Sequence, residues 1–303
     1  MKRLPQIALL PDGKRLHLQD GPIDLIVEAV GSASDRRAAY DAAARRFTGL
    51  LDELCGELRL LRQAADPERC PLQGVVARRM HAAVAPFAAA HFITPMAAVA
   101  GSVAEEILAA MTEVAHLERA YVNNGGDIAL YLTDGERFSV GLMDRPDPSG
   151  TMRTIAIDAD DPSRGIATSG RHGRSFSLGI ADAVTVLART ASQADAAATI
   201  IANSVDLPGH PAITRCPARD LQPDSDLGAR LVTRDVGDLS GHEIAATLES
   251  GAACARRLLA MGLIDGAILR LHGETVVVAA KAMGQAGLRA PATGSAIESM
   301  MHA

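Results

Sequence analysis

Tryptophan is absent from this chain of 303 residues, other aromatic side chains are few, and no run of lysines or arginines occurs. Surfaces that bind nucleic acid need exposed aromatic side chains on which bases stack and basic side chains that hold phosphates. The formal net charge is instead −6 at pH 7. We therefore expect no nucleic acid among the partners of this protein.

Closely spaced cysteines are also missing. Cys55, Cys70, Cys216 and Cys254 show no CxxC spacing, which zinc sites and thioredoxin-like motifs require. We expect these thiols to be reduced and partly buried. The chain also lacks the GxSxG, HExxH, P-loop and GxGxxG motifs, so none of the enzyme classes that these motifs mark is indicated.

Long apolar runs are missing too, since no stretch approaches the roughly 20 residues of a membrane span. The N-terminal apolar run covers only residues 7–10, whereas a secretory signal has about 7–15 such residues. These patterns predict a cytoplasmic protein that does not contact the membrane. Apolar residues still make up 48% of the chain, which is enough for a large core.

Hydrophobic periodicity and turn dipeptides predict a mixture of strands and helices. Strands are expected over residues 7–10, 15–18, 23–27, 120–122, 127–132, 138–142, 154–157, 183–187, 267–271 and 275–278. Helices are expected over about residues 34–66, 75–90, 97–111 and 192–203, and from Ser240, which forms a capping box with Glu243. Residues 206–236 are rich in Pro and Asp and predict a surface connection, and residues 284–303 a flexible tail. The hairpins imply antiparallel pairing, so we predict an α+β fold. The length fits one large domain or two closely packed ones.

The segment Asn123-Asn124-Gly125-Gly126-Asp127 is the first candidate binding element. Two glycines after a strand allow positive φ angles and a close approach of a ligand to the backbone. Exposed amides in such a turn can cradle phosphate or ribose oxygens. Asn-Gly is also a common hairpin signal, so a plain hairpin turn is the alternative interpretation.

Thr168, Ser169 and Gly170 form the second element, in a Gly- and Ser-rich loop expected over residues 167–173. Hydroxyls beside a glycine can face an anion, and the basic Arg171 and His172 follow directly. An ordinary Ser/Thr turn is the alternative.

Asp195 and Thr199 form the third element, four residues apart on a predicted helix and therefore on one face of it. A carboxylate and a hydroxyl provide oxygen ligands for Mg²⁺, with water or phosphate oxygens completing its octahedral geometry. The alternative is an Asp that the helix macrodipole favours near a helix start, beside a Thr that only packs.

The order of these elements resembles the ApbE-like superfamily, the FAD:protein FMN transferases. That family carries a helix with the motif KGY..D, followed by N.GGD, TSG and ADA..T. The matching residues here are Ala100 to Glu105, Asn123 to Asp127, Thr168 to Gly170, and Ala194 to Ala196 with Thr199. These motifs span about residues 95–205. The remainder is similar to a branch of the family with GPIDL, TPMA.VAG and SLG.ADAVTV segments, which begin here at Gly21, Thr94 and Ser177.

The resemblance implies a single domain over residues 1–303, built of two intertwined tunnel-fold-like (T-fold) halves with antiparallel sheets covered by helices. It also implies a flavin nucleotide, FAD or FMN, bound with Mg²⁺ between the halves, and Asp195 and Thr199 as metal ligands. The residues that it places near the nucleotide are Gly101, Asn123, Asn124, Gly125, Gly126, Asp127, Thr168, Ser169 and Gly170. A nucleotide-like small molecule is thus an expected partner, and we expect a homodimer.

The chain also departs from the family's pattern. Ala100, Ser102 and Glu105 stand where the family has Lys, Tyr and Asp, and the HH..DP.TG stretch expected after TSG is missing. We therefore expect an activity that differs from protein flavinylation, in the transferase or hydrolase class if the protein is an enzyme. The catalytic candidates are Asp182 and His172, with a backbone-bonded Asp and a surface His as the alternatives. A different small-molecule enzyme that reuses the cleft, and a non-enzymatic binding or assembly protein, are the rival functions.

Overall fold

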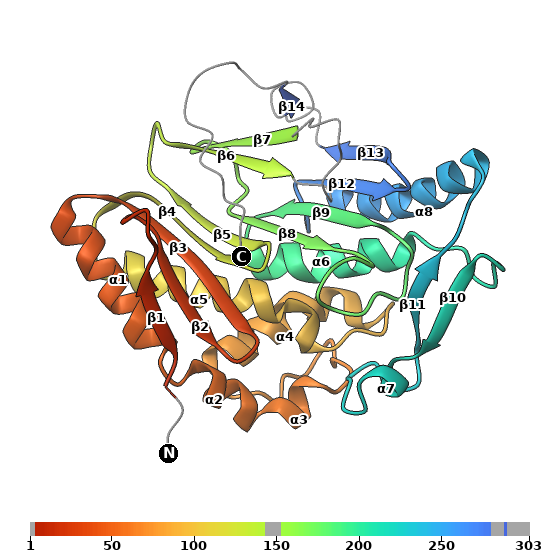
Figure 1. Ribbon diagram of the computed structural model, residues 1–303, viewed down its shortest axis with the longest axis horizontal. Helices are drawn as coiled ribbons and strands as arrows, with labels where there is room; N and C mark the ends of the chain where they lie inside the picture. Colours follow the sequence, from red (N-terminus) through yellow and green to blue (C-terminus); the bar gives the residue numbers. More distant parts are fainter. Residues whose placement is uncertain (1–3, 143–152, 280–287, 290–303) are drawn as a thin grey trace.

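The main sheet is built from antiparallel pairs of strands, in the order β1-β2-β3-β4-β5-β8-β9-β12-β13 (Figure 1). The computed structural model describes residues 4–142, 153–279 and 288–289. The strands of this sheet are β1 (Gln6–Leu9), β2 (Leu16–Asp20), β3 (Ile23–Gly31), β4 (Leu117–Asn124), β5 (Asp127–Leu132), β8 (Gly165–Ser169), β9 (Ala183–Ala188), β12 (Gly266–Leu271) and β13 (Glu274–Ala279).

Helices cover one face of this sheet, and a small sheet of order β14-β7-β6 lies on the other (Figure 1). The helices are α1 (Ala33–Phe47), α2 (Leu50–Gly56), α3 (Leu58–Leu61), α4 (Val75–Ala88), the 3₁₀ helix η1 (Pro95–Ala98), α5 (Val99–Thr112), α6 (Ala191–Ser204), α7 (Ala218–Leu221) and α8 (Gly241–Ala260). The remaining strands are β6 (Arg137–Leu142), β7 (Arg153–Asp158), β10 (Ile213–Pro217), β11 (Leu231–Val236) and β14 (Leu288–Arg289).

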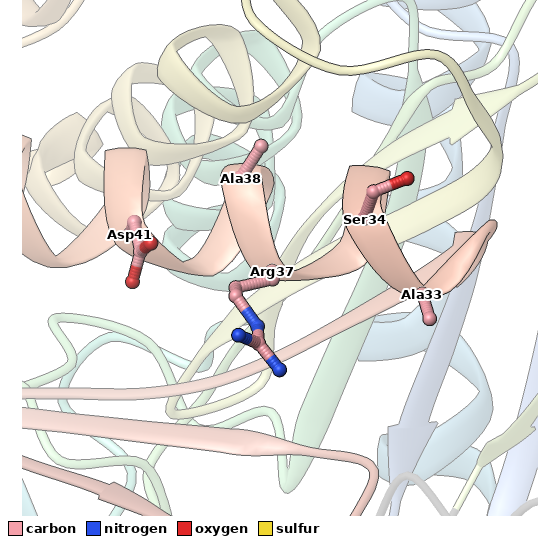
Figure 2. Close-up of a pocket in the computed structure, with 5 residues that line it drawn as sticks. All are labelled: Ala33, Ser34, Arg37, Ala38 and Asp41. Atoms are coloured by element: carbon pink, nitrogen blue, oxygen red, sulfur yellow. The ribbon is translucent and has the colours of Figure 1, made fainter.

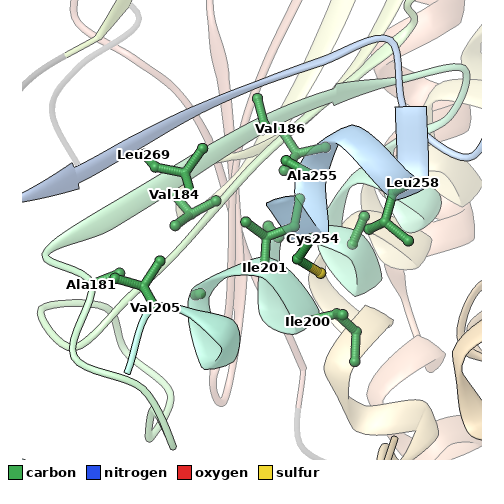
Figure 3. Close-up of a cluster of buried hydrophobic side chains, with 14 of the residues drawn as sticks. Ala181, Val184, Val186, Ile200, Ile201, Val205, Cys254, Ala255, Leu258 and Leu269 are labelled. Atoms are coloured by element: carbon green, nitrogen blue, oxygen red, sulfur yellow. The ribbon is translucent and has the colours of Figure 1, made fainter. Parts of the chain in front are cut away.

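Strand alternation decides which side chains enter each layer, because successive residues of a strand face opposite sides of the sheet. In β9, Val184 and Val186 pack against the helices, whereas Leu187 belongs to the cluster under the small sheet. Figure 3 shows the helix-side cluster, in which Val184, Val186 and Leu269 of the sheet meet Ile201 of α6 and side chains of α8. A second helix-side cluster fills the space between β2–β5 and helices α1, α4 and α5. The two halves of the chain thus bury their helices against one continuous sheet.

The hairpin registers bring several turns to one end of the sheet. Because β2–β3, β4–β5, β8–β9 and β12–β13 are adjacent antiparallel pairs, the connections at residues 20–23, 124–127, 170–182 and 271–274 all lie at the same end. Glycines with positive φ form the tight ones, as at Gly21, Gly125 and Gly273. The Gly125–Gly126 turn between β4 and β5 and the connection that follows Ser169 of β8 therefore lie at the same end of the sheet.

The helix layer is fixed by close contacts at the start of α6. A methyl group on Gly101 of α5 would lie 2.3 Å from the Ala191 carbonyl oxygen, and one on Gly165 of β8 would lie 2.1 Å from the Thr190 carbonyl carbon. Only glycine permits both approaches. One further contact joins α5 to α6, because Glu105 Oε1 accepts the Ser192 amide at 2.6 Å.

The structure confirms the predicted α+β class and corrects several element boundaries. The helix expected over residues 34–66 is wrong as a single element, because it ends at Phe47 and restarts after Gly49, whose φ of 89° interrupts it. The loop expected over residues 167–173 starts later, since β8 extends to Ser169. Residues 206–236 carry the β10–β11 hairpin and α7 in place of a plain connection. The tail predicted to be flexible, residues 284–303, lies outside the described residues except for 288–289.

In the described ranges, none of the helices combines the length and the apolar character that a membrane crossing requires.

We predict that Gly165→Ala destabilises the protein by about 1–3 kcal/mol, because the added methyl group overlaps backbone atoms that cannot move aside. Urea unfolding monitored by circular dichroism measures the change. Gly56→Ala is the matched control, since Gly56 ends α2 with no atom near its added methyl group. Equal stability of both variants and the wild type would contradict the proposed close contact of β8 with the start of α6.

Candidate functional site

The β4–β5 connection is a two-residue hairpin turn. Gly125 and Gly126 have φ angles of 64° and 107°, which residues with side chains rarely adopt. The Gly126 amide donates to Asn123 Oδ1 at 2.8 Å, and Asn124 Nδ2 donates to the Ala100 carbonyl of α5 at 3.2 Å. The hairpin interpretation is therefore correct for this backbone, and Asn124 additionally ties the turn to the helix layer.

Asp127 begins β5, and strand alternation places its side chain on the helix-covered face together with Ala129. Its Oδ1 accepts a hydrogen bond from the Thr168 amide near the end of β8 at 3.1 Å. Burial raises the pKa of Asp127 to about 7, although the Thr168 amide acts in the opposite direction. The first and second predicted elements are therefore in direct contact.

Asp195 lies on α6 and faces the start of α5. Its Oδ2 accepts the Gly101 amide at 3.0 Å, and the Ala100 amide also donates to this carboxylate. Burial and, next, the negative charge of Asp127 raise the pKa of Asp195 well above its usual range, against the effect of the two amides. The structure thus brings two carboxylates together beneath the sheet, one from each half of the chain.

Among the residues that the structure describes, no cationic side chain shifts the pKa of Asp127 or of Asp195. Both residues are half-buried. Like charges held this close favour either a retained proton or a bound cation. This arrangement is the most unusual electrostatic feature of the site.

The oxygen atoms available at this point suit a hard cation. Thr199 lies one turn after Asp195 on the same face of α6 and is half-buried. Residues 4–142, 153–279 and 288–289 contain no group of at least three His, Cys, Asp or Glu side chains that could hold a metal. Two carboxylates and a hydroxyl do not complete a zinc site, which needs nitrogen or sulfur ligands. They fit Mg²⁺, which keeps several waters or phosphate oxygens as ligands.

Thr168 and Ser169 lie on opposite faces of the sheet, because both belong to β8. Thr168 Oγ1 is 2.9 Å from Thr185 Oγ1, on the face away from the helices. Ser169 shares the helix-side face of β8 with the buried Ala167. Gly170 follows with a φ of 152°, and a methyl group there would lie 2.5 Å from the Asp182 carbonyl oxygen. The two hydroxyls therefore lie on opposite sides of the sheet and do not face one phosphate together, whereas the sequence interpretation placed both in one loop.

Asp182 forms a second polar cluster at the same end of the sheet. Its Oδ1 accepts from Arg171 Nη2 at 2.6 Å and lies 3.3 Å from His172 Nε2. Its Oδ2 accepts the amide of His272 in the β12–β13 turn at 2.5 Å. Asp182 thus accepts a backbone amide, as the alternative interpretation of this residue in the sequence expected. It also lies close enough to His172 to orient the imidazole.

Sequence reasoning gave no site role to Thr185 or Arg174, and it did not predict the backbone contacts of Ala100. Ala100 takes part through its backbone, which no side-chain motif reveals. The pairing of Thr168 with Thr185 follows from the β8–β9 register, which could be found by aligning the two apolar strands. Arg174 Nη2 donates to the Pro22 carbonyl at 2.9 Å, a contact between residues far apart in the sequence.

Two surface depressions in the described part of the chain do not include Asp127 or Asp195. One of 460 Å³ is lined only by α1 residues (Figure 2), which are Ala33, Ser34, Arg37, Ala38 and Asp41. Another of 240 Å³ lies between α4, α5 and β5, and includes Arg79, Glu105 and Arg189. The candidate site therefore rests on the placement of Asp127 and Asp195 and not on cavity size.

The raised pKa of Asp127 predicts a pH-dependent effect of Asp127→Asn. A carboxyl group whose pKa is raised by folding holds its proton more tightly in the native state, so its contribution to stability falls as pH rises from about 4 through about 7. In chelator-treated buffer, Asp127→Asn should be more stable than the wild type by about 1 kcal/mol or more at pH 8 and equal to it near pH 4. Urea unfolding at both pH values measures this. Asp41→Asn, at an exposed position of α1, is the control, and an Asp127→Asn effect independent of pH would contradict the prediction.

Comparison with known proteins places the chain in a family. The family model described as "AbpE bacteria" matches residues 7–277. A UPF0280 protein of Methanothrix thermoacetophila is 39% identical over 117 residues, which are 37% of this chain and 46% of the relative. A UPF0280 protein of Methanocella arvoryzae is 35% identical over 162 residues, 53% of this chain and 63% of the relative. The chain spans about half the length of the curated relatives that it matches first.

A solved structure shows the same fold. The apo form of the Pseudomonas stutzeri flavinyl transferase ApbE superposes with a TM-score of 0.53 over 92% of this chain and 96% of that chain, at 13% sequence identity. At this identity the likeness concerns the fold alone. With the family match over residues 7–277, the ApbE-like resemblance drawn from the motifs is confirmed, and the chain belongs to the AbpE bacteria family, an ApbE-like branch.

Proposed function

We propose that this protein binds a flavin nucleotide, FAD or FMN, together with Mg²⁺ at the Asp127–Asp195 pair. The observation that carries the proposal is the placement of these two half-buried carboxylates: Asp195 accepts the Gly101 amide, and the turn that precedes Asp127 is bonded to Ala100 next to it. The charge of Asp127 raises the pKa of Asp195, and no lysine or arginine of the described residues is among the groups that shift either pKa. Membership of an ApbE-like family and the fold shared with a flavinyl transferase support the choice of ligand. The ligand and the metal are carried over from these relatives, and the residues that would hold them are those of this chain.

Asp127, Asp195 and Thr199 would hold the cation. Asp127 was expected to shape the nucleotide pocket, but its coupling to Asp195 makes it a better candidate for a metal ligand. A bound Mg²⁺ would neutralise negative charge on the phosphate oxygens of the ligand. The Thr168 amide holds the Asp127 carboxylate, and the Gly101 amide holds that of Asp195. The chain therefore fixes both acids with backbone donors, which keep their positions without a bound ligand.

The activity that this site supports is a transfer or hydrolysis at a phosphate group, distinct from protein flavinylation. His172 is the candidate proton carrier, and Asp182 the residue that orients it. An imidazole beside a carboxylate can accept a proton from an attacking hydroxyl or water and deliver it to a leaving group. The missing HH..DP.TG stretch and the replacement of Lys by Ala100 remove groups that the flavinylating relatives carry, which favours a different acceptor.

We also propose a homodimer and a cytoplasmic location. The open edge of the main sheet at β1 exposes Ile7 by 42% and Leu9 by 54%. An exposed edge strand with apolar side chains is a surface on which a second chain can pair. Sedimentation velocity should show a dimer that Ile7→Lys converts to a monomer of unchanged circular dichroism. A monomeric wild type at micromolar concentration would remove the homodimer from the proposal.

The binding proposal predicts Mg²⁺-dependent affinity for flavin nucleotides. We expect saturable binding of FAD or FMN to the wild type in calorimetry, weakened about tenfold or more when Mg²⁺ is replaced by chelator. Asp195→Asn should lose the Mg²⁺ dependence, since it removes one charged ligand of the cation. Asp41→Asn, an exposed carboxylate on α1, should bind as the wild type does.

Two results would contradict this reading in different ways. Absence of saturable binding by any flavin would remove the flavin, and a thermal-shift screen with nucleotides, pterins and carboxylates would then identify the ligand of a different enzyme on the same site. Flavin binding that Asp195→Asn leaves unchanged, with and without Mg²⁺, would instead indicate a binding module without a metal site.

A further inference from the structure

Arg174 lies across the glycine turn at the end of the sheet. Its Nη1 is 3.1 Å from the position that a methyl group on Gly125 would occupy. Its Nη2 donates to the carbonyl oxygen of Pro22 in the β2–β3 turn at 2.9 Å. The guanidinium therefore lies between the β2–β3 and β4–β5 turns at the same end of the sheet, although Arg174 belongs to the β8–β9 connection.

The connection that carries Arg174 is held firmly at its base. The Gly173 amide donates to the Gly170 carbonyl at 3.1 Å, and the Arg171 amide donates to the Ala181 carbonyl at 2.9 Å. Arg171 is also paired with Asp182. The backbone next to Arg174 is thus a hydrogen-bonded turn. The position of the guanidinium therefore depends on the conformation of the Arg174 side chain.

The present acceptor of Arg174 is a poor match for a guanidinium. Arg174 is exposed, and the Pro22 carbonyl is neutral, so this hydrogen bond lacks the second charge that makes guanidinium pairs strong. A phosphate oxygen offers a charged acceptor with a geometry that suits two parallel N–H donors. Arg171 is less suited to bind a phosphate, because it already pairs with the Asp182 carboxylate at 2.6 Å.

We propose that Arg174 is a recognition residue for the phosphate of the ligand. In the free protein it rests on the Pro22 carbonyl. When a phosphorylated ligand lies along the Gly125–Gly126 turn, the guanidinium leaves Pro22 and binds a phosphate oxygen. This assignment rests on the proposed function and deepens it. It makes the phosphate group of the ligand, and not its isoalloxazine ring, the part that Arg174 recognises.

Gly125 has a defined place in this arrangement. A side chain there would meet Arg174 Nη1, and the φ of 64° already disfavours any other residue. The positive φ of Gly125 is thus what requires glycine here, and the nearby Arg174 side chain could shift to admit a methyl group.

The experiment compares three flavins with the wild type, Arg174→Gln and Arg189→Gln. Riboflavin has no phosphate, FMN has one and FAD has two. Arg174→Gln should weaken FMN and FAD binding by about tenfold to a hundredfold, the usual loss for a hydrogen bond to a charged group, and leave riboflavin binding unchanged. Arg189→Gln removes an exposed arginine elsewhere and should change none of the three affinities. Melting temperatures of both variants confirm that they are folded.

The outcomes separate this inference from the proposed function. Equal weakening of riboflavin, FMN and FAD would show a structural role, and no weakening would show no role, so either result overturns the inference while flavin binding stands. If the wild type binds no flavin, inorganic pyrophosphate is the second probe. Pyrophosphate binding that Arg174→Gln abolishes would keep the phosphate assignment without the flavin, and no pyrophosphate binding would overturn both.

Discussion

Two carboxylates on the helix-covered side of one sheet, close enough to interact electrostatically, impose the main constraint on this structure. Asp127 comes from the first half of the chain and Asp195 from the second, and the charge of one raises the pKa of the other. Each is held by backbone amides, from Thr168 and from Gly101. A folded protein keeps such an unfavourable pair only where the surrounding packing enforces it. A cation that turns this repulsion into attraction is the simplest reason for the pair to exist.

The packing that enforces the pair is built from small residues. Gly165 lets β8 approach the start of α6, and Gly101 lets α5 approach the same point. Glu105 accepts the Ser192 amide and pairs with Arg79 at 3.2 Å. A side-chain carboxylate thus provides a hydrogen-bond acceptor for one of the free amides at the N-terminus of α6. The position at which an ApbE-like relative has Asp therefore joins two helices here. The low aromatic content of the chain fits this architecture, because large rings would hold the helices away from the sheet.

Much of this could be predicted from the sequence because it is local. Turn glycines and alternating apolar residues predicted the hairpins, and the spacing of Asp195 and Thr199 placed both on one face of a helix. The α+β class followed from the hairpins, and the ordered motifs indicated the family. The sequence could not show that Thr168 and Ser169 face opposite sides, since a short Ser/Thr run is compatible with either a loop or a strand end. It also could not show the electrostatic interaction of Asp127 with Asp195 or the hydrogen bond of Arg174 to Pro22, because both depend on long-range strand order.

The central claim is that Asp127 and Asp195 hold a divalent cation. Mn²⁺ is the most suitable probe, because it accepts the same oxygen ligands as Mg²⁺ and scatters X-rays anomalously. Crystals grown with Mn²⁺ should give one strong anomalous peak within bonding distance of both carboxylates. Crystals with Mn²⁺ bound elsewhere, or with the two carboxylates bridged only by a proton in the presence of excess Mn²⁺, would contradict the account.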